Sequence, residues 1–174
     1  MAATPPGHVV TALRPARAEE TAQVDGWRAD PQTEYEEWGD PPPGLPPDAP
    51  WPKPCGMGEL LITDGADTPI GTVGWHQVLH GPGAGSIALD IGISLRPEAR
   101  GHGHGSRAQR MLADYLFATF AVHRVQASTD VTNAAEQGAL ERAGFTREGL
   151  IRGAQWRQGE WHDLVSYARL RTDA

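Results

Sequence analysis

The sequence predicts a mixed α+β fold, and three observations lead to this prediction. Apolar and polar residues alternate with the period of a β-strand in several short segments of the chain. One such segment, 86–95, leads directly into the glycine-rich stretch "RPEARGHGHGSRAQ" at 96–109, after which apolar residues recur at helical spacing. The segment 145–170 predicts two strands joined by the turn "RQGE". We therefore expect several antiparallel strands, then a β–loop–α–β–α unit, then a closing hairpin.

The residues before the glycine-rich stretch predict strands, one helix and a loop. We expect a first strand over 8–16, where apolar and polar residues alternate, and a helix over 16–30 that stops before a proline. Residues 41–54, "PPPGLPPDAPWPKP", predict a loop, because proline lacks the backbone donor that helices and central strands need. Strands over 58–64 and 70–79 should form a hairpin across the turn "DGADTP".

The residues after the glycine-rich stretch predict two helices and three strands. Apolar residues recur at helical spacing over 106–120, and a strand follows over 123–130. The second helix should span 133–144, because Asn133 is a favourable N-cap residue and Gly144 a favourable terminator. The closing hairpin supplies the last two strands.

Length, composition and charge limit the functions that the chain can have. With 174 residues, of which 39% are hydrophobic, we expect a single domain over 1–174. A net charge of -7 argues against a nucleic-acid-binding surface, which needs a basic patch. No apolar run approaches the ~20 residues of a membrane span, and no signal-peptide pattern opens the chain, so we expect no membrane partner. Because Cys55 is the single cysteine, no internal disulfide can form, which favours a cytoplasmic location.

The glycine-rich stretch supports two hypotheses, of which the first is a metal site. His102 and His104 lie two positions apart, a spacing at which two histidines can share a metal ion on a strand. A zinc site needs three or four ligands, however, and the other histidines have no carboxylate or cysteine at a recognisable ligand spacing. We therefore expect no metal, and we interpret both histidines as spacers in an exposed turn.

The second hypothesis is a phosphate-binding loop, and it explains more of the stretch. A loop between a strand and a helix presents unpaired N–H groups at the helix N-terminus, where the dipole also favours anions. Gly101, Gly103 and Gly105 would let the main chain curl around a pyrophosphate, with Arg100 adding charge and Ser106 capping the helix. The spacing is neither that of a Walker loop nor that of a Rossmann motif.

Three blocks, in order along the chain, resemble one known family. "LDIGISLRPEARGHG" at 89–103 resembles a family strand leading into the family loop, and "RGHGHG" at 100–105 resembles that loop itself. "TDVTNAAEQGALERAGFTREGLIR" at 129–152 resembles the block in which an asparagine opens a helix, and "GEWHDLVSYARL" at 159–170 resembles the closing strand. The family is the GNAT superfamily of N-acetyltransferases, more narrowly its RimJ/RimL-like branch of ribosomal-protein N-terminal acetyltransferases. The resemblance covers about 59–171.

The resemblance implies a fold, a co-substrate and a division of the chain. The fold would be a central, twisted, mostly antiparallel sheet of six to seven strands, splayed at the acetyl-CoA site and flanked by about four helices. Residues 59–171 would form the acetyl-CoA-binding core. Residues 1–58, with the proline-rich loop 41–54, would form a variable segment on the substrate side. The implied co-substrate is acetyl-CoA, with no metal.

The resemblance also implies how acetyl-CoA is held. It would lie between the strands 86–95 and 123–130, with its pyrophosphate in the glycine loop. The main-chain N–H near Leu95 would polarise the thioester carbonyl as an oxyanion donor. Asn133 would contact the pantetheine arm or order a water, and its role as a plain helix cap is an equal alternative. The residues implied to bind acetyl-CoA are Ile93, Ser94, Leu95, Arg100, Gly101, His102, Gly103, His104, Gly105, Ser106 and Asn133.

For the chemistry, the resemblance implies direct attack of an amine on the thioester, for which a base must remove a proton. Asp90 stands where many relatives have a glutamate and is the candidate base, with a structural pairing to an arginine as the alternative. Glu136 and Leu140 stand where relatives have the serine or tyrosine that assists thiolate departure. Glu136 could act as base or acid, although we expect a salt bridge on the helix surface.

The amine acceptor is expected on the N-terminal side of the domain. An acidic, aromatic mouth with Trp27, Glu34 and Trp38 would suit a cationic amine, either a small molecule or a peptide N-terminus. Trp75 is expected in the core instead. A catalytically silent acyl-CoA-binding or regulatory module on the same fold is the alternative function. The closing strands offer a face through which two copies could form a homodimer.

Overall fold

The computed structural model describes residues 11–29, 57–81 and 86–173, and a seven-stranded sheet is their main element. The strand order is β1-β2-β3-β4-β5-β7-β6, and all neighbours are antiparallel except β4 and β5. The strands are β1 (Ala12–Arg14), β2 (Gly58–Thr63), β3 (Pro69–Leu79), β4 (Ile87–Leu95), β5 (Arg124–Asp130), β6 (Thr146–Arg157) and β7 (Glu160–Leu170). The α-helices are α1 (Thr21–Ala29), α2 (His104–Thr119) and α3 (Ala134–Arg142), and the short 3-10 helices are η1 (Ala18–Glu20), η3 (Pro97–Ala99) and η4 (Arg171–Asp173).

The expected α+β class and the mostly antiparallel sheet are confirmed. The described ranges contain three α-helices where about four were expected. The first strand is shorter than the expected 8–16, and residues 1–10 and the loop 41–54 lie outside the described residues. No helix in the described part of the chain has the length and hydrophobicity to cross a membrane.

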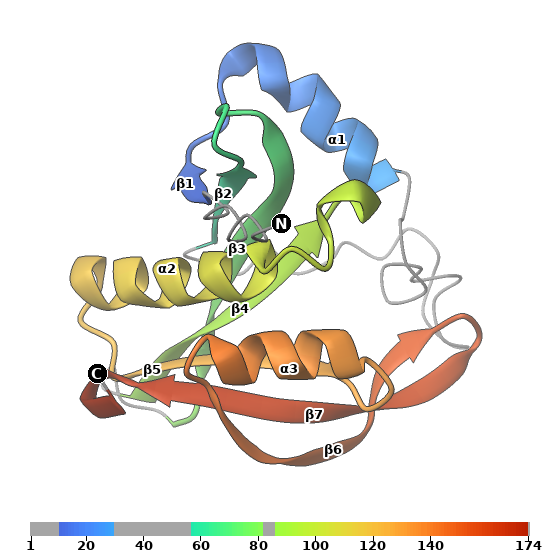
Figure 1. The fold of residues 1–174 in the computed structure, drawn as a ribbon. Coiled ribbons are helices and arrows are strands. Elements are labelled where there is room, and N and C mark those ends of the chain that lie inside the picture. Colours follow the sequence, from blue (N-terminus) through green and yellow to red (C-terminus); the bar gives the residue numbers. More distant parts are fainter. Residues whose placement is uncertain (1–10, 30–56, 82–85, 174) are drawn as a thin grey trace, which may run out of the picture.

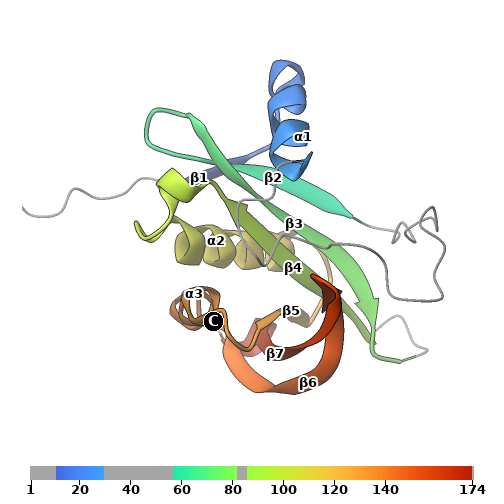
Figure 2. The ribbon, with the colours of Figure 1, turned by 90° about the vertical axis from the view of Figure 1, so that its right-hand side faces the viewer.

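Two helices cover one face of the sheet. Figure 1 shows α2 and α3 side by side in front of the strands, and the view along the sheet in Figure 2 places both on the same side. The core lies between these helices and the sheet, where Leu89 and Ile91 of β4 belong to the same buried cluster as Leu112 and Leu140. The face of β4 that lies under these helices is therefore its apolar face.

α2 forms where apolar residues recur at every fourth position. Ala108, Leu112 and Leu116 are fully buried against the sheet. Met111 and Tyr115, which share the helical spacing, lie at the edge of this face and are 38% and 42% exposed. The apolar face that the sequence predicted is therefore confirmed, but it is narrower than expected.

Local sequence signals placed the ends of α3 and the β6–β7 turn correctly. The Asn133 side chain accepts a hydrogen bond from the N–H of Glu136 at 3.2 Å, so Asn133 caps α3 as expected. Gly144 follows α3 with φ of 92°, a conformation that favours glycine. In the turn between β6 and β7, Gln158 and Gly159 both have positive φ, 52° and 84°, as a tight hairpin turn of type I′ requires.

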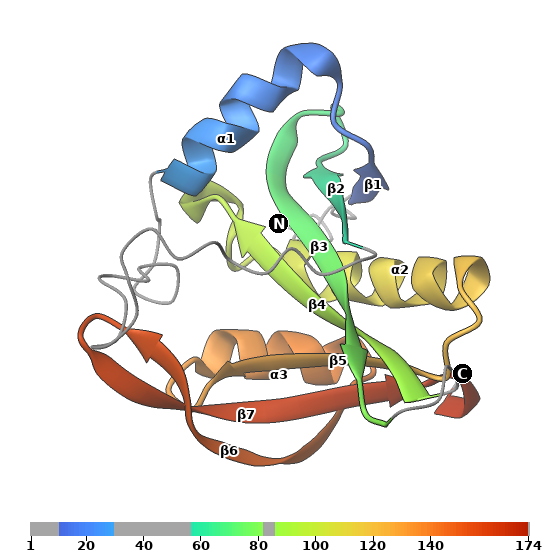
Figure 3. The same cartoon turned by 180° about the vertical axis from the view of Figure 1, so that it is seen from behind.

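The two parallel strands of the sheet pair over a short stretch and then separate. β4 pairs with β5 only at Ala88–Arg124, Leu89–Val125 and Asp90–Gln126, although it pairs with β3 along its whole length. Figure 3 shows β4 and β5 diverging beyond this point, on the side where α1 and the β6–β7 turn lie. The splay that the resemblance implied is therefore present in this fold.

Truncating a buried side chain of α2 should destabilise the protein far more than truncating its neighbour. Leu112→Ala removes a fully buried side chain and should lower the free energy of unfolding by about 2–5 kcal/mol. Met111→Ala, one position earlier at the edge of the buried face, should cost under about 1 kcal/mol. Urea denaturation of both variants tests this, and equal losses would contradict the packing of α2.

Candidate functional site

A cleft of about 490 Å³ opens where β4 and β5 separate. Its walls are β4 from Ile91 to Leu95 and β5 from Ala127 to Asp130, with the start of α3 and the end of β6 closing it. A concave site of this volume at a break in a sheet is the usual place for a small-molecule ligand. The groups that line this cleft therefore decide what it can bind.

The main chain of β4 presents hydrogen-bonding groups to this cleft. The N–H of Arg96 donates to the carbonyl of Ile70 at 3.0 Å, so the adjacent pair Gly71–Leu95 is a non-hydrogen-bonded pair of the antiparallel ladder. The N–H and carbonyl of Leu95 therefore point away from β3, toward the cleft. The Leu95 N–H could therefore donate to a ligand in the cleft.

The same alternation decides which other residues of β4 face the cleft. Non-hydrogen-bonded and hydrogen-bonded pairs alternate, so the main-chain groups of Ile91 and Ile93 also point away from β3. Ser94 pairs with Thr72, and its main-chain groups face β3 instead. The expectation that the Ser94 main chain faces a ligand in the cleft is therefore wrong, because it has the opposite phase of the ladder.

The glycine loop reaches its shape through two left-handed residues. Gly101 and Gly103 have φ of 75° and 82°, a region in which any other residue is strained. Gly103 is the N-cap of α2, and Ser106 donates its hydroxyl to the Gly103 carbonyl at 3.2 Å. The prediction that Ser106 caps the helix is therefore wrong, and the N–H groups of the first turn of α2 remain directed out of the helix.

Two contacts join the loop to the end of β4. The Arg100 guanidinium donates from two nitrogens to the Leu95 carbonyl, at 2.9 and 2.7 Å, and Arg100 also lines the cleft. Gly105 lies so close to β4 that a Cβ there would be 3.5 Å from the Leu95 side chain and 3.9 Å from that of Ile93. The loop and the first turn of α2 therefore sit directly at the outer end of the cleft.

The two histidines of the loop have different environments. His102 is exposed, but His104 is 8% exposed, and its Nδ1 lies 2.9 Å from the Thr11 hydroxyl of the segment entering β1. Burial, with the nearby charges of His102 and Arg107, lowers the pKa of His104. Describing His104 as a spacer in an exposed turn is therefore wrong. No group of three or more His, Cys, Asp or Glu side chains that could hold a metal ion occurs within the described ranges.

Asp90 lies at the last paired position before the strands separate. It faces His76 on β3 and Gln126 on β5, and Gln126 Nε2 donates to its Oδ2 at 3.0 Å. Burial raises the pKa of Asp90, and the Gln126 hydrogen bond acts in the opposite direction. The hydrogen-bond partner of this carboxylate is thus an amide and not an arginine.

Glu136 is a largely buried carboxyl group that lines the cleft from α3. Gln109, a buried residue of α2, donates its Nε2 to the Glu136 carboxyl group. Burial raises the pKa of Glu136 to about 7, against the lowering effect of Gln109. The expected salt bridge on the helix surface is therefore wrong, because α2 packs over this side of α3.

Sequence reasoning missed a charged pair at the other end of the cleft. Arg157 donates to Asp130 at 2.6 Å, both residues are 3% exposed, and His162 lies 3.2 Å from the same carboxylate. Burial alone would raise the pKa of Asp130, but hydrogen bonds from Thr132 and Arg157 hold it down to about 2. Asp130 and Arg157 are far apart in the chain, so no local pattern could have paired them.

The residues expected on the acceptor side are only partly described. The Arg96 guanidinium lies 5.3 Å from the ring centroid of Trp27, so a cation of the protein already occupies one face of that ring. Glu34 and Trp38 lie outside the described residues. Trp75 packs against the core with its ring 6.0 Å from that of Tyr115, as expected.

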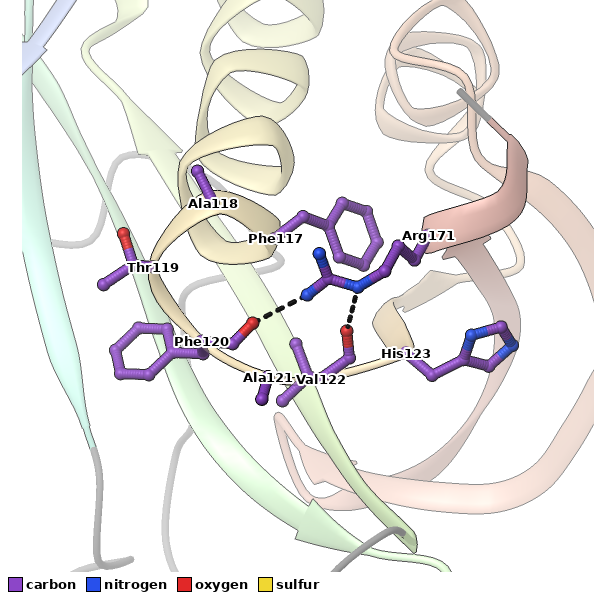
Figure 4. Close-up of a pocket in the computed structure, with 8 residues that line it drawn as sticks. All are labelled: Phe117, Ala118, Thr119, Phe120, Ala121, Val122, His123 and Arg171. Atoms are coloured by element: carbon purple, nitrogen blue, oxygen red, sulfur yellow. Dashed lines mark hydrogen bonds between the residues drawn. The ribbon is translucent and has the colours of Figure 1, made fainter.

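A second hollow lies at the C-terminal end of α2, and its polar groups have structural partners. Figure 4 shows the Arg171 guanidinium aimed at the chain leaving the helix, where it donates to the carbonyls of Phe120 and Val122 at 2.7 and 2.9 Å. The same guanidinium lies 5.4 Å from the Phe117 ring centroid. Arg171 thus anchors the connection from α2 to β5, and we place the candidate site in the β4–β5 cleft.

Known proteins share this sequence pattern and this fold. A family model described as "Acetyltransferase (GNAT) domain" matches residues 11–146. Among curated proteins, the "Probable N-acetyltransferase YjcK" of Bacillus subtilis (strain 168) is 34% identical over 113 residues, which are 65% of this chain and 61% of the relative. The match thus spans less than two thirds of that relative's own length.

Two solved structures illustrate the structural likeness. Mycobacterium smegmatis RimJ in complex with CoA-disulfide superimposes with a TM-score of 0.72 at 23% identity, covering 94% of this chain and 83% of that one. The ribosomal-protein-S5-alanine acetyltransferase of Vibrio fischeri superimposes with a TM-score of 0.59 at 25% identity, covering 67% and 63%. The first likeness supports the fold over nearly the whole chain.

The buried carboxyl of Glu136 should make the stability of the protein depend on pH. Its pKa of about 7 lies above that of an unfolded glutamate, so the folded chain binds the proton more tightly and loses stability as pH rises from about 4 to 7. Glu136→Gln removes this loss and should be more stable than the native protein by ~2 kcal/mol at pH 8, with almost no difference at pH 4. Urea denaturation at both pH values tests this, and a pH-independent difference would contradict it.

Proposed function

Because the chain belongs to the GNAT acetyltransferase family, we propose that it transfers an acetyl group from acetyl-CoA to a primary amine by direct attack in a ternary complex. The observation that carries this proposal is the cleft at the β4–β5 separation, in which main-chain groups of β4 point away from β3 on one wall and the Glu136 carboxyl group lies in the lining. The ligand supplies the activated acetyl group, and the chain binds it, aligns it and moves the protons.

The loop and the cleft fit the two ends of acetyl-CoA. Cβ atoms built on Gly101 and Gly103 would meet nothing within 4 Å, so an anion can approach the main chain there. Leu95 lies beside this loop, whereas the pantetheine arm separates a thioester from its pyrophosphate. We therefore assign the oxyanion donor to the N–H of Ile93, deeper in the cleft, and give Leu95 a contact with the arm, since the Ile91 N–H is directed to Gln126 in the β4–β5 ladder.

Asp90 is the proposed base. It lies where the strands separate, on the face of β4 opposite Leu89 and Ile91, which pack under the helices. A protonated amine must lose a proton before it can attack, and Asp90 would accept that proton directly or through one water. The alternative role for Asp90, a structural ion pair with an arginine, has less support because the carboxylate accepts its hydrogen bond from Gln126.

Glu136 is the proposed acid. Its pKa of about 7 leaves it partly protonated at neutral pH, as a group that donates a proton in the transition state needs to be. Leu140 stands at the other position where relatives have an acid, and it is 1% exposed in the core, so it has no such role. The amine nitrogen loses two protons in all, one to Asp90 before attack and one from the tetrahedral adduct after it, and Glu136 gives one proton to the leaving thiolate. Once both carboxyl groups have exchanged protons with water, each turnover releases one net proton.

A peptide N-terminus is the acceptor class that we favour. The S5-alanine acetyltransferase of Vibrio fischeri, which shares this fold, is named for a ribosomal-protein substrate. A small-molecule amine is the second class. The contact of Trp27, Glu34 and Trp38 with the acceptor remains a prediction. The cytoplasmic location and the homodimer are predictions as well.

A substitution in the glycine loop should weaken acetyl-CoA binding. Gly103→Ala disfavours the left-handed conformation at the N-cap of α2, so the free loop relaxes to another shape. Acetyl-CoA must then restore the original shape on binding, which should cost about a tenfold loss of affinity. Gly149→Ala is the matched control, since its Cβ would also meet nothing within 4 Å and its φ is not positive. Calorimetric titration with acetyl-CoA measures both, and unchanged affinity in Gly103→Ala would argue against a pyrophosphate site in the loop.

Removing the proposed base should affect turnover and not acetyl-CoA affinity. Asp90→Asn should lower kcat/KM for an accepted amine or peptide by about 10²–10⁴, while its acetyl-CoA affinity stays near that of the native protein. Asp114→Asn, at an exposed carboxylate of α2, is the control. Coenzyme A release with a panel of amines and N-terminal peptides gives the rates. Tight acetyl-CoA binding without turnover on any acceptor would instead identify the catalytically silent module.

A further inference from the structure

We propose that Gln126 is a positioning residue that acts through Asp90 and keeps its carboxylate in the charged form, using an amide that Arg124 and His80 hold in one orientation. This inference rests on the proposed role of Asp90 as the base. It adds a residue of β5 to a reaction so far assigned to β4, the glycine loop and α3.

The Gln126 amide forms a bridge between Asp90 and two basic side chains. Its Nε2 donates to Asp90 Oδ2 at 3.0 Å. Its Oε1 lies 3.0 Å from Nε of Arg124 and 2.7 Å from Nε2 of His80. Because Asp90 and Gln126 form the last pair of the β4–β5 ladder, this bridge stands directly at the point where the cleft opens.

Donor and acceptor chemistry allows only one orientation of this amide. A guanidinium N–H can only donate, so the Gln126 atom beside Arg124 must be the carbonyl oxygen. The NH₂ group must then face Asp90, and the hydrogen bond that it donates is stronger to a charged carboxylate than to a neutral carboxyl group. The same oxygen requires that His80 carries its proton on Nε2. Every group of the bridge therefore favours a charged Asp90.

The anchor of the bridge is itself held in place. Arg124 forms a two-pronged ion pair with Glu148 of β6, at 2.7 and 2.5 Å, so its Nε has a fixed direction. The ionisable groups around Asp90 in the described residues are then His76 of β3, His80 directly after β3 and Arg124 of β5, with Glu148 behind Arg124. Burial works against the charged carboxylate, and the Gln126 hydrogen bond is the strongest opposing contribution to its pKa.

Two substitutions separate this role from a structural one. Gln126→Glu has nearly the same shape and can still accept from Arg124 and His80, but it cannot donate to Asp90 and adds a like charge beside it. Gln126→Leu removes the bridge without adding charge. Gln77→Leu is the control, since Gln77 is an exposed amide on the neighbouring strand β3, paired with Leu89 and not with Asp90.

The first measurement follows Asp90 directly and needs no turnover. Carbon-13 NMR of labelled aspartate carboxyl groups, assigned by the signal missing in Asp90→Asn, gives the titration midpoint of Asp90 in each folded variant. We expect a higher midpoint in Gln126→Leu, a still higher one in Gln126→Glu, and no change in Gln77→Leu. An unchanged midpoint in both Gln126 variants would overturn the inference, even in an active enzyme.

The second measurement links this titration to the reaction. For this measurement, kcat/KM is determined across pH with the same amine substrate for Gln126→Leu and for the native protein. The ratio of the two values cancels the titration of the amine, because that titration affects both equally. The ratio should fall about tenfold at the acid end of the profile, as the loss of one charge-assisted hydrogen bond implies, and approach one at the alkaline end. A ratio that is low but independent of pH would mean a merely structural residue and would overturn the inference. A raised midpoint in a protein without turnover would leave the Gln126 bridge standing and overturn the proposed function instead.

Discussion

The separation of β4 from β5 is the constraint on which the rest of this structure depends. On its other side, each strand forms a full ladder of backbone hydrogen bonds, β4 with β3 and β5 with β7. The sheet therefore stays intact although the ladder between β4 and β5 stops after Asp90–Gln126. Buried backbone N–H and carbonyl groups need partners, and those of Ile93, together with the Ile91 carbonyl and the Leu95 N–H, point into the cleft instead of into a neighbouring strand. A ligand with alternating donors and acceptors, such as a pantetheine arm, satisfies them in the way a strand would.

The two faces of the sheet divide the proposed chemistry between them. Apolar side chains of β4 pack under α2 and α3, and those helices also provide the glycine loop and Glu136. The opposite side of β4 carries Asp90. The cleft thus connects a helix-covered side, which suits the cofactor, with a side that lacks α2 and α3, which suits the acceptor (Figure 2).

Two carboxyl groups of the site are both buried and both next to an amide, yet their surroundings differ. The Gln126 amide beside Asp90 has its oxygen engaged by Arg124 and His80, which favours the charged carboxylate. The Gln109 amide beside Glu136 has a buried oxygen with no hydrogen-bond partner among the described residues, so nothing comparable supports the charge of Glu136. This contrast gives a physical basis for a base and an acid in one cleft, since divergent environments push two pKa values apart.

The sequence alone determined those features that depend on neighbours along the chain. The period of α2, the Asn133 cap and the Gln158–Gly159 turn are local, and they were predicted correctly. The family resemblance rests on similar local blocks. Only the tertiary structure decided the state of the polar side chains, because burial depends on which distant segment packs against them. Thr11 reaches His104, Gln109 reaches Glu136, and Gln126 reaches Asp90, from elements that no sequence spacing connects. The phase of the β4 ladder, which turns Ser94 away from the cleft and Ile93 toward it, likewise comes from pairing with β3.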